Sequence, residues 1–379
     1  MKNIVIFGAG KFGKMALKEY SGSVKFFVDN NTDIIGKNVE GIPVIDIQTL
    51  CNVHDNYKII IATKYYKPII DQLLSLDIKS YDIYQTDLYR YYPTNELVWN
   101  PYQEGGEYIE HADSVTNYKI AEVNDEVEKL YNKPELFNHI EIETINRCNG
   151  YCDFCPVSVH HDTRQYKIMD NNLFEKIVNQ LAEINYSGKI ALFSNNEPFL
   201  DPDIIDKHKY TRDKLPQARM HLFTNGTLLN IEKFSNIMKY LDELIIDNYQ
   251  QDLKLIKPCK EIEDYCEQHP ELKSKVTIVL RKPHEILSTR GGDAPNREKV
   301  CMYPKAKCVL PFKQMIIRPD GKVSLCCNDP LGKNTLGDAS KNSLLDIWNN
   351  DRFKMVRQCL YNGREHWNHC QYCDTFNFG

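Results

Sequence analysis

The sequence predicts an α/β protein with two regions in which strands and helices alternate. Short apolar runs with β-branched residues recur along both regions, and the segments between many of them are long enough for helices. Such alternation is typical of parallel sheets whose strands are joined by helices. The chain has 379 residues, which is enough for two or three domains that each bury a core.

The first region predicts a small parallel sheet. Its strands are expected at 3–7, 25–28, 58–62 and 81–84, with one helix at 68–76. Residues 93–136 contain Pro, Gly and scattered Tyr, and they predict a linker with one helix near 125–131.

The second region predicts an open or partial α/β barrel. The helix expected at 171–184 has apolar residues on one face. Active residues in such barrels lie at the carboxyl ends of the strands. From Cys308 onward the sequence predicts short strands, a hairpin turn at Pro319-Asp320-Gly321 and an amphipathic helix at 344–357. The barrel strands are expected at 139–145, 189–193, 219–223, 244–246 and 276–280.

Composition excludes several classes of protein. The net charge is −5, which argues against a strongly basic nucleic-acid binder. The sequence has no apolar run near the roughly 18 residues of a membrane span, and its first residues do not resemble a signal peptide. The 13 cysteines are an odd number without an export signal, so a disulfide framework is not expected. We therefore predict a cytoplasmic protein whose cysteines bind metal.

The first cysteine pattern is Cys148-x3-Cys152-x2-Cys155, directly after a predicted strand. Three thiolates around a four-iron cluster leave one iron open to a small chelating molecule. The alternative is a zinc knuckle whose fourth ligand is His160 or His161.

The second cysteine pattern combines Cys308 and Cys326 with Cys370-x2-Cys373. The predicted hairpin at Pro319-Asp320-Gly321 brings Cys308 and Cys326 close together. Four thiolates with no open position suit a cluster held entirely by the protein, and on spacing alone they suit a zinc ribbon equally well.

The CxxxCxxC pattern after the first strand of a βα series resembles the radical S-adenosylmethionine (SAM) superfamily. This resemblance implies a partial (β/α)6 barrel over residues 137–300. It implies that Cys148, Cys152 and Cys155 bind a [4Fe-4S] cluster, whose open iron binds the amino nitrogen and carboxylate of SAM. Cleavage of SAM then gives a 5′-deoxyadenosyl radical.

The resemblance extends to the ends of later strands. Ser194-Asn195-Asn196-Glu197-Pro198 is similar to the Gly-Gly-Glu-Pro-like segment that receives the SAM amino group, with Asn in place of both glycines. A turn or capping role is the alternative for Asn225 and Asp247, and a surface role for Arg281. The cofactor-binding residues that the resemblance implies are Phe154, Asn195, Asn196, Glu197, Asn225, Asp247 and Arg281.

Residues 301–379 resemble the SPASM/Twitch extension of radical SAM enzymes. The pattern C-x12-G-x4-C, a helix of the form SLLDIWNNDRF and a final CxxC are similar to the one-cluster Twitch form. The resemblance implies a second, auxiliary [4Fe-4S] cluster. Cys327 is an alternative to Cys326, and Cys359 is a weaker competitor. The implied ligands are Cys308, Cys326, Cys370 and Cys373.

Residues 1–92 are predicted to form a Rossmann-like domain. Gly8-x-Gly10-x-x-Gly13 follows a strand and begins a helix, and Asp29 ends the next strand. Residues 27–45 resemble the N-terminal nucleotide-binding module of sugar O-acyltransferases, which implies a nucleotide or nucleotide-sugar ligand. The alternatives are NAD(P) and a scaffold without a ligand.

Taken together, these patterns predict an oxidoreductase or epimerase that removes hydrogen from a small polar, sugar-like substrate. Oxidation would send an electron to the auxiliary cluster, whereas epimerisation would need a thiol hydrogen donor. An electron donor such as flavodoxin or ferredoxin is expected as a partner. The alternatives are modification of a ribosomal peptide, a zinc-stabilised binding protein and an NAD(P) dehydrogenase. The candidate hydrogen donors are Cys259, Cys266, Cys301 and Cys327.

Overall fold

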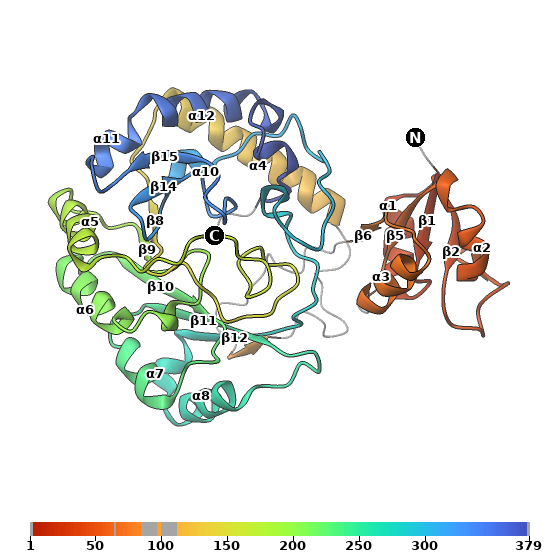
Figure 1. The fold of residues 1–379 in the computed structure, drawn as a ribbon, viewed down its shortest axis with the longest axis horizontal. Helices are drawn as coiled ribbons and strands as arrows, with labels where there is room; N and C mark the ends of the chain where they lie inside the picture. The colour runs from red at the N-terminus through yellow and green to blue at the C-terminus, as the bar shows by residue number, and fades with distance from the viewer. Residues whose placement is uncertain (1–2, 64–65, 85–96, 100–111, 377–379) are drawn as a thin grey trace. The chain divides into compact units, whose positions relative to one another are not determined.

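The computed structural model describes residues 3–63, 66–84, 97–99 and 112–376. The chain forms two compact units, which we call the N-terminal unit and the C-terminal unit. The N-terminal unit contains strands β1 to β6, and the C-terminal unit contains strands β7 to β15 (Figure 1). The finer domain boundaries expected from the sequence remain predictions, and parts of the expected linker, 93–96 and 100–111, lie outside the described residues.

The N-terminal unit is a six-stranded sheet in the order β3-β4-β2-β1-β5-β6. All neighbouring strands are parallel except β3 and β4, which form an antiparallel pair. The four expected strands are present, whereas β3, β4 and α2 were not expected because such short segments show no periodicity. The elements are β1 (Asn3–Phe7), α1 (Lys11–Glu19), β2 (Val24–Val28), β3 (Asn38–Val39), β4 (Ile42–Ile45), α2 (Ile47–Cys51), β5 (Tyr57–Ile61), α3 (Tyr66–Ser75) and β6 (Asp82–Ile83).

Both faces of this sheet are buried. Ile4 and Ile6 of β1 pack with Ala16 of α1 on one face. Val5 and Phe7 of β1 belong to a second cluster, which includes residues of α2 and α3, on the other face. Helices therefore cover both faces, as in doubly wound nucleotide-binding folds.

The C-terminal unit is built on a nine-stranded sheet in the order β15-β14-β13-β8-β9-β10-β11-β12-β7. All neighbouring strands from β13 to β7 in this order are parallel. Strand β14 pairs antiparallel with both β13 and β15. Helices α5 to α8 lie on the outer side of the curved sheet (Figure 1). The strands are β7 (Val98–Trp99), β8 (His139–Ile142), β9 (Lys189–Ala191), β10 (Arg219–Thr224), β11 (Glu243–Tyr249), β12 (Val276–Arg281), β13 (Gln314–Ile317), β14 (Lys322–Ser324) and β15 (Thr335–Asp338).

The helices of this unit confirm the βα alternation and add detail to it. The helix expected near 125–131 is longer, and the helix expected over 344–357 is two helices, because Asn350 accepts the Phe353 N–H and begins a new one. The helices are α4 (Ala112–Asn132), α5 (Asn171–Glu183), α6 (Ile204–Lys214), α7 (Ile231–Ile237), α8 (Lys257–Gln268), α9 (Pro270–Lys273), α10 (Leu310–Lys313), α11 (Leu344–Trp348) and α12 (Asp351–Asn362).

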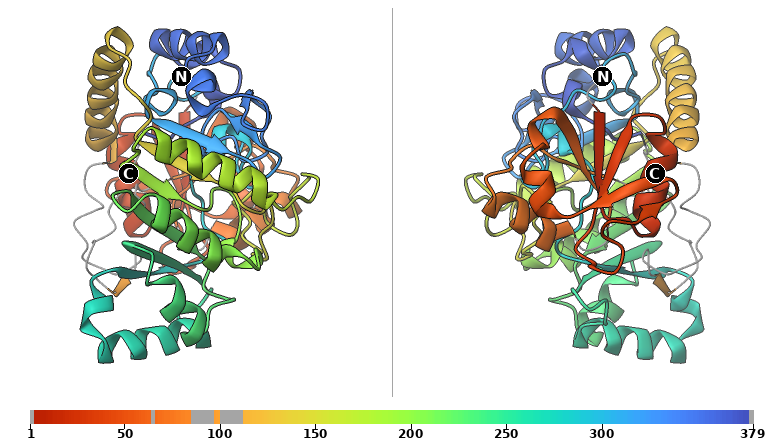
Figure 2. Two further views of the ribbon diagram at one scale, coloured as in Figure 1. Left: turned by 90° about the vertical axis from the view of Figure 1, so that its left-hand side faces the viewer. Right: turned by 90° about the vertical axis from the view of Figure 1, so that its right-hand side faces the viewer.

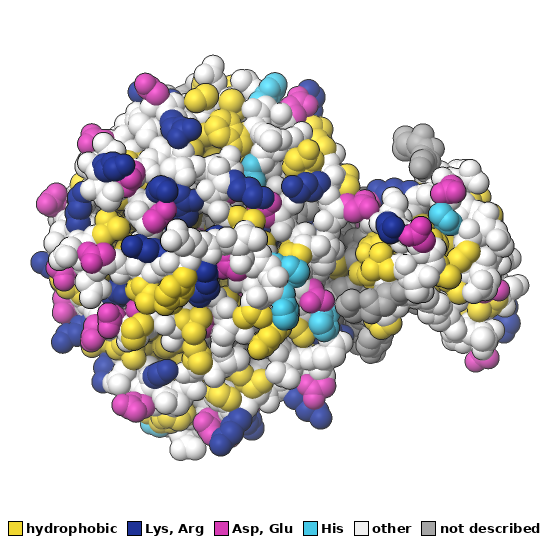
Figure 3. All heavy atoms as spheres, in the orientation of Figure 1, with side chains coloured by type: hydrophobic (Ala, Val, Ile, Leu, Met, Phe, Trp, Pro, Cys, Tyr) yellow, Lys and Arg dark blue, Asp and Glu magenta, His cyan; other side chains and the backbone are white. Residues whose placement is uncertain are grey.

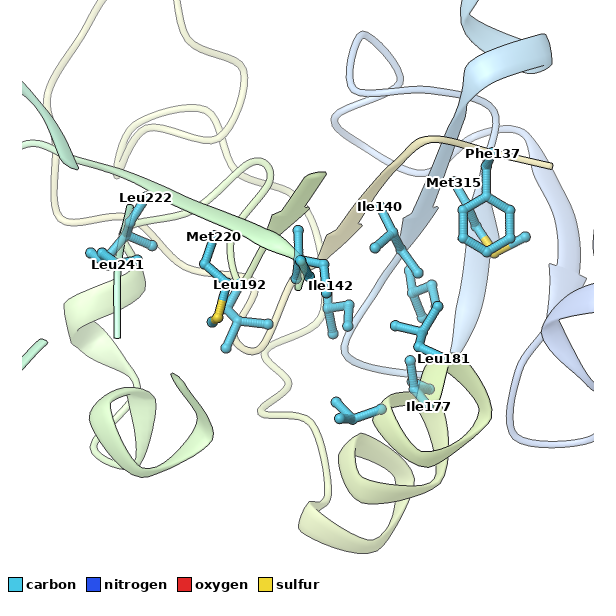
Figure 4. Close-up of a cluster of buried hydrophobic side chains, with 14 of the residues drawn as sticks. Phe137, Ile140, Ile142, Ile177, Leu181, Leu192, Met220, Leu222, Leu241 and Met315 are labelled. Carbon is cyan, nitrogen blue, oxygen red and sulfur yellow. The ribbon is translucent and has the colours of Figure 1, made fainter. Parts of the chain in front are cut away.

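The hydrophobic core lies between the sheet and the outer helices. Ile140 and Ile142 of β8 point toward Ile177 and Leu181 of α5 (Figure 4). Successive strand residues face opposite sides, so His139, Glu141 and Glu143 face the inside of the partial barrel. The inner face of β8 is therefore polar.

Three further observations complete the description of the fold. Helices α4 and α12 lie side by side (Figure 2), and the rings of Tyr131 and Tyr361 stack with centroids 4.1 Å apart. On the face shown in Figure 3, positive and negative side chains are interspersed. Within the described residues, no helix has both the length and the apolar character that a membrane crossing needs.

Candidate active site

The three cysteines of the CxxxCxxC pattern lie in the loop that follows β8, at the carboxyl end of the barrel. Cys152 is buried, and the Cys148 Sγ accepts the Gly150 N–H at 3.3 Å. Burial raises the pKa of the Cys152 thiol well above its usual range, and the nearby Cys155 and Cys148 raise it further. A cationic cluster would hold these thiols as thiolates, so the donor set fits the expected [4Fe-4S] group.

Glu197 joins the segment after β9 to the end of β10. Its Oε1 accepts hydrogen bonds from the Thr224 hydroxyl at 2.8 Å and the Phe199 N–H at 3.1 Å. Its Oε2 accepts the Asn225 N–H at 2.8 Å. Both oxygens thus bond to protein groups, and burial raises the pKa of Glu197 to about 7. The geometry gives this residue a positioning role in addition to its expected contact with SAM.

Asn225 and Asn196 lie on the two segments that Glu197 joins. The Asn225 Nδ2 donates to the Asn149 Oδ1 at 2.7 Å, which places Asn225 beside the cysteine loop. The Asn196 Oδ1 accepts the Ser194 N–H at 2.9 Å, while its buried Nδ2 has no hydrogen-bond partner in the described part of the chain. An unpaired buried donor fits the carboxylate of a bound amino acid such as the methionine part of SAM.

Phe154 belongs to the cysteine loop, and Asp247 lies within electrostatic range of Cys152. Phe154 is buried and its ring centroid lies 5.9 Å from that of Tyr249, at the end of β11. Burial raises the pKa of Asp247 to about 6, although the nearby Arg281 lowers it. The Asp247 Oδ1 receives no hydrogen bond from the described residues and lies 3.7 Å from the Arg281 Nε.

Arg281 ends β12 and is buried, which excludes the surface role that was the alternative in the sequence. Its Nη1 donates to the Glu285 Oε2 at 3.1 Å. The guanidinium thus holds one carboxylate and lies next to a second, that of Asp247.

The second set of cysteines gathers from three segments of the C-terminal region. Cys308 precedes α10, Cys326 follows β14, and Cys370 and Cys373 lie near the end of the chain. Burial raises the pKa of Cys326 well above its usual range, and Cys327, Cys370, Cys308 and Cys373 add to this effect. The four expected ligands therefore lie within electrostatic range of one another.

Arg364 holds this group together. It is almost fully buried, and it donates from Nη1 to the Cys373 carbonyl at 2.7 Å and from Nη2 to the Thr375 carbonyl at 2.6 Å. Its charge lowers the pKa of Cys308 against the larger opposite effect of burial. A buried cation beside Cys308 and Cys370 favours their thiolate form, which an iron–sulfur cluster requires.

No three His, Cys, Asp or Glu side chains of the described residues converge as ligands of a single metal ion. In a four-iron cluster each thiolate binds a different iron, so the cysteines need not converge on one point. Both cysteine sets fit this requirement by the number and chemistry of their donors.

The candidate hydrogen donors lie in different surroundings. Cys259 and Cys266 are fully buried on α8 in the hydrophobic core, and Cys301 is exposed. Cys327 faces Glu141 and Arg290, whose charges act on its thiol. Of the four candidates, Cys327 is thus next to the polar interior of the barrel. Cys359 lies on α12.

Sequence reasoning missed a buried network around Arg164. Its Nη1 donates to the Glu143 Oε1 at 2.9 Å, and its Nε and Nη2 donate to the two Asp162 oxygens at 3.0 Å each. Its Nη2 also donates to the Asn195 carbonyl at 2.9 Å. The network fixes the cysteine loop against the segment after β9. No spacing pattern in the sequence predicts these contacts.

Sequence reasoning also missed Glu141. The alternation of His139, Glu141 and Glu143 with isoleucines was the available signal, since it places three polar side chains on one face of a buried strand.

The glycine loop of the N-terminal unit has the expected geometry. A Cβ on Gly8 would lie 2.7 Å from the Ala62 carbonyl oxygen, and one on Gly13 would lie 1.8 Å from the Gly8 oxygen. A Cβ on Gly10 would have open space around it. Asp29 uses its Oδ2 to accept the Ala9 N–H at 2.8 Å. The loop lies where the strand order reverses between β1 and β5, the usual place for a ligand in such sheets.

Comparison with known proteins agrees with these features. Residues 142–254 match the model of the radical SAM superfamily, and residues 308–374 match that of the SPASM iron–sulfur cluster-binding domain. The chain is 25% identical over 232 residues to the S-adenosyl-L-methionine-dependent 2-deoxy-scyllo-inosamine dehydrogenase of Niallia circulans, covering 60% of this chain and 89% of the relative.

A solved structure shows a similarity of the same kind. The crystal structure of BtrN in complex with AdoMet and 2-DOIA is 25% identical to this chain, with a TM-score of 0.55. The similarity covers 64% of this chain and 94% of that one. The protein is therefore a radical SAM enzyme that carries a SPASM iron–sulfur cluster-binding domain.

Proposed function

We propose that the enzyme oxidises a secondary alcohol carbon of a small, sugar-like polyol to a ketone. The observation that carries this proposal is the similarity to an inosamine dehydrogenase over 89% of that relative's length. When bound, SAM and its cluster supply a 5′-deoxyadenosyl radical, which removes a hydrogen atom from carbon. Cys148, Cys152 and Cys155 would hold that cluster, and Asn196 and Asp247 each offer a buried polar atom that has no hydrogen-bond partner among the described residues.

The second cysteine set would hold the auxiliary cluster, which accepts the remaining electron of the oxidation. Cys308, Cys326, Cys370 and Cys373 are the proposed ligands. The polar interior between the two sets contains carboxylate, amide, hydroxyl and guanidinium groups, which suit a substrate rich in hydroxyl groups.

Epimerisation is the second candidate, and the position of Cys327 favours it. A thiol that faces the barrel interior can return a hydrogen atom to the opposite face of a substrate carbon. Anaerobic turnover in D2O separates the two outcomes. A ketone without deuterium at carbon supports oxidation, whereas deuterium at the inverted carbon supports epimerisation. Absence of 5′-deoxyadenosine from iron-reconstituted protein with SAM, reductant and a panel of inosamines and sugars contradicts both.

We further propose a reducing cytoplasmic setting, with flavodoxin or ferredoxin as the electron donor. Thiolate-bound clusters assemble under reducing conditions, and cleavage of SAM needs one electron from a low-potential source. Comparing 5′-deoxyadenosine formation with reduced flavodoxin, reduced ferredoxin and dithionite tests this proposal. Turnover with dithionite but with neither reduced flavodoxin nor reduced ferredoxin would contradict it.

For the N-terminal unit we propose a nucleotide or nucleotide-sugar ligand. Gly8, Gly10 and Gly13 would shape the phosphate loop, and Asp29 would lie beside the ribose. Thermal-shift measurements on the full chain with UDP, UDP-glucose, ADP and NAD test it. A shift with none of these nucleotides contradicts the proposal and favours a scaffold role.

A further inference from the structure

Glu141 is a buried carboxylate in the centre of the barrel that the cofactor sites do not use. It lies on the inner face of β8 and is 6% exposed. Its Oε2 accepts the Ser194 hydroxyl at 2.5 Å, and its Oε1 accepts the Gln314 Nε2–H at 2.7 Å. Both donors are neutral, so neither neutralises a charge on the carboxylate.

Other buried carboxylates of this unit are arranged differently. Glu143 pairs with Arg164 at 2.9 Å, Asp201 with Lys207 at 2.7 Å, and Glu285 with Arg281 at 3.1 Å. A close cation or several backbone N–H donors favour the ionised form of a carboxylate and make it a weaker base. Within the part of the chain that the structure describes, Glu141 instead bonds to a hydroxyl and an amide and has the His139 ring at 3.8 Å.

The contacts of Glu141 lead to both proposed cluster sites. Ser194 directly precedes Asn195 and Asn196, in the segment expected to bind SAM. On the other side, the Gln314 Oε1 accepts the Cys327 N–H at 3.4 Å, next to the proposed ligand Cys326. Glu141 thus lies between the place where hydrogen is removed and the place that accepts the electron.

The charged and titratable groups facing Glu141 come from several elements. His139 and Glu143 flank it on β8, and Arg290 and Cys327 face it from the loops. Burial raises the pKa of Glu141 to about 7, with Ser194 and Arg290 acting in the opposite direction and Glu143 in the same one. A base is most effective when its pKa lies near the working pH.

We propose that Glu141 is the base that takes the hydroxyl proton of the substrate when its carbon is oxidised. This proposal rests on the proposed function. After a hydrogen atom leaves carbon, the remaining carbon radical bears a hydroxyl group. The O–H bond breaks, its proton forms an O–H bond with the Glu141 carboxylate, and one electron passes to the oxidised auxiliary [4Fe-4S] cluster. A C=O double bond results, and atoms and electrons balance.

The His139 ring lies beside Glu141 and is neutral. Its Nδ1 lies 3.2 Å from the Gln314 Nε2, which can only donate, so Nδ1 accepts and Nε2 carries the proton in the neutral ring. Burial lowers the pKa of His139 to about 4, so the ring is neutral. Nε2 lies 3.8 Å from the Glu141 Oε1, and the His221 ring follows at a centroid distance of 5.3 Å. The neutral ring therefore places no cation beside the Glu141 carboxylate.

The first test compares Glu141→Gln with Glu175→Gln, which removes the same charge from an exposed position on α5. We expect the ketone formed per 5′-deoxyadenosine to fall about 100-fold in E141Q. Formation of 5′-deoxyadenosine should stay at the level of E175Q. In the wild type, ketone formation should rise with pH through about 7, and E141Q should lose this dependence. Equal ketone yields in E141Q and wild type overturn the proposal, whereas a wild type that forms no ketone overturns the proposed function.

The second test does not depend on turnover. Infrared difference spectra of the wild type between pH 5 and pH 8 should contain a protonated carboxyl band that is missing from E141Q and present in E175Q. If the spectra of E141Q and wild type coincide, Glu141 does not titrate in this range and the proposal fails. If E141Q does not retain its clusters, Glu141→Asp decides, because it keeps a carboxylate and should keep the pH dependence of ketone formation.

Discussion

The Glu197 carboxylate accepts the Asn225 N–H at 2.8 Å and so joins two segments that follow neighbouring strands. The same carboxylate also accepts the Thr224 hydroxyl at the end of β10. Through Asn149, the bonded partner of Asn225, this link reaches the first cysteine loop. One side chain thus sets the positions of three loops that surround the expected SAM site.

We expect Glu197→Ala to destabilise the chain by about 1–3 kcal/mol, because it leaves buried N–H and hydroxyl donors without partners. Urea denaturation of the metal-free protein measures this change, with E175Q as a surface control. SAM affinity of the reconstituted protein should fall as well. Unchanged stability and affinity in E197A would show that the link is dispensable.

Cys326 and Cys327 should differ in what they bind. Cys326→Ser should remove about four of the eight irons expected for two [4Fe-4S] clusters, since it removes one of four ligands. Cys327→Ser should retain all of them. Iron and acid-labile sulfide analysis decides between the two, and the opposite pattern would make Cys327 the ligand.

Arg164→Ala should cost about 3–5 kcal/mol, because it leaves Glu143 buried without its cation and leaves Asp162 only its longer pair with Arg147, at 3.4 Å. The matched control is Arg219→Ala, which breaks an exposed arginine–glutamate pair with Glu243 and should cost at most about 1 kcal/mol. Chemical denaturation of both variants measures the difference. Similar losses in the two variants would contradict the structural role of the Arg164 network.

Glu141 should also make stability depend on pH. Its pKa is about 7 in the folded chain, against the usual 4.5, so the folded state binds more protons between these values. The free energy of unfolding should therefore fall as the pH rises from about 4.5 to about 7, by on the order of 3 kcal/mol from this group. E141Q lacks this contribution. Urea denaturation of metal-free E141Q and wild type at pH 5 and pH 8 should show the smaller loss in E141Q, and equal losses would refute the raised pKa.

The glycine loop offers a matched pair of variants. Gly13→Ala should destabilise the N-terminal unit, because its Cβ would collide with the Gly8 carbonyl. Gly10→Ala has room for its Cβ and should leave stability unchanged, but it should weaken binding of the proposed nucleotide by filling the open space. Thermal shifts with and without UDP-glucose measure both effects. A G10A variant that binds as well as wild type would argue against a phosphate at this position.

Much of the architecture was predictable because it depends on local patterns. Strand and helix periodicity indicated the parallel sheets, and the radical SAM and SPASM regions were indicated by cysteine spacing. The helix expected over 344–357 was wrong in detail, because its apolar face continues across the break at Asn349 and Asn350. Only the capping contact of Asn350 shows where the second helix begins.

The interior of the site was less predictable. Arg281 looked equally suited to the surface, since burial of an arginine depends on partners from other strands such as Asp247. Ser194 and Gln314 lie 53 and 173 positions from Glu141 along the chain, and only the sheet brings the three together. Contacts of this kind follow from tertiary structure and leave no spacing signal.

The parallel pairing of β13 with β8 has a consequence for how such an enzyme is built. Because β13, β14 and β15 extend the same sheet, removing the SPASM region would uncover the hydrogen-bonding edge of β8 along with part of the shared core. An exposed apolar strand edge recruits other chains, so the truncated barrel should aggregate. The SPASM region therefore also covers the edge of the barrel that carries the first set of cysteines. We expect the barrel and the SPASM region to be inherited together.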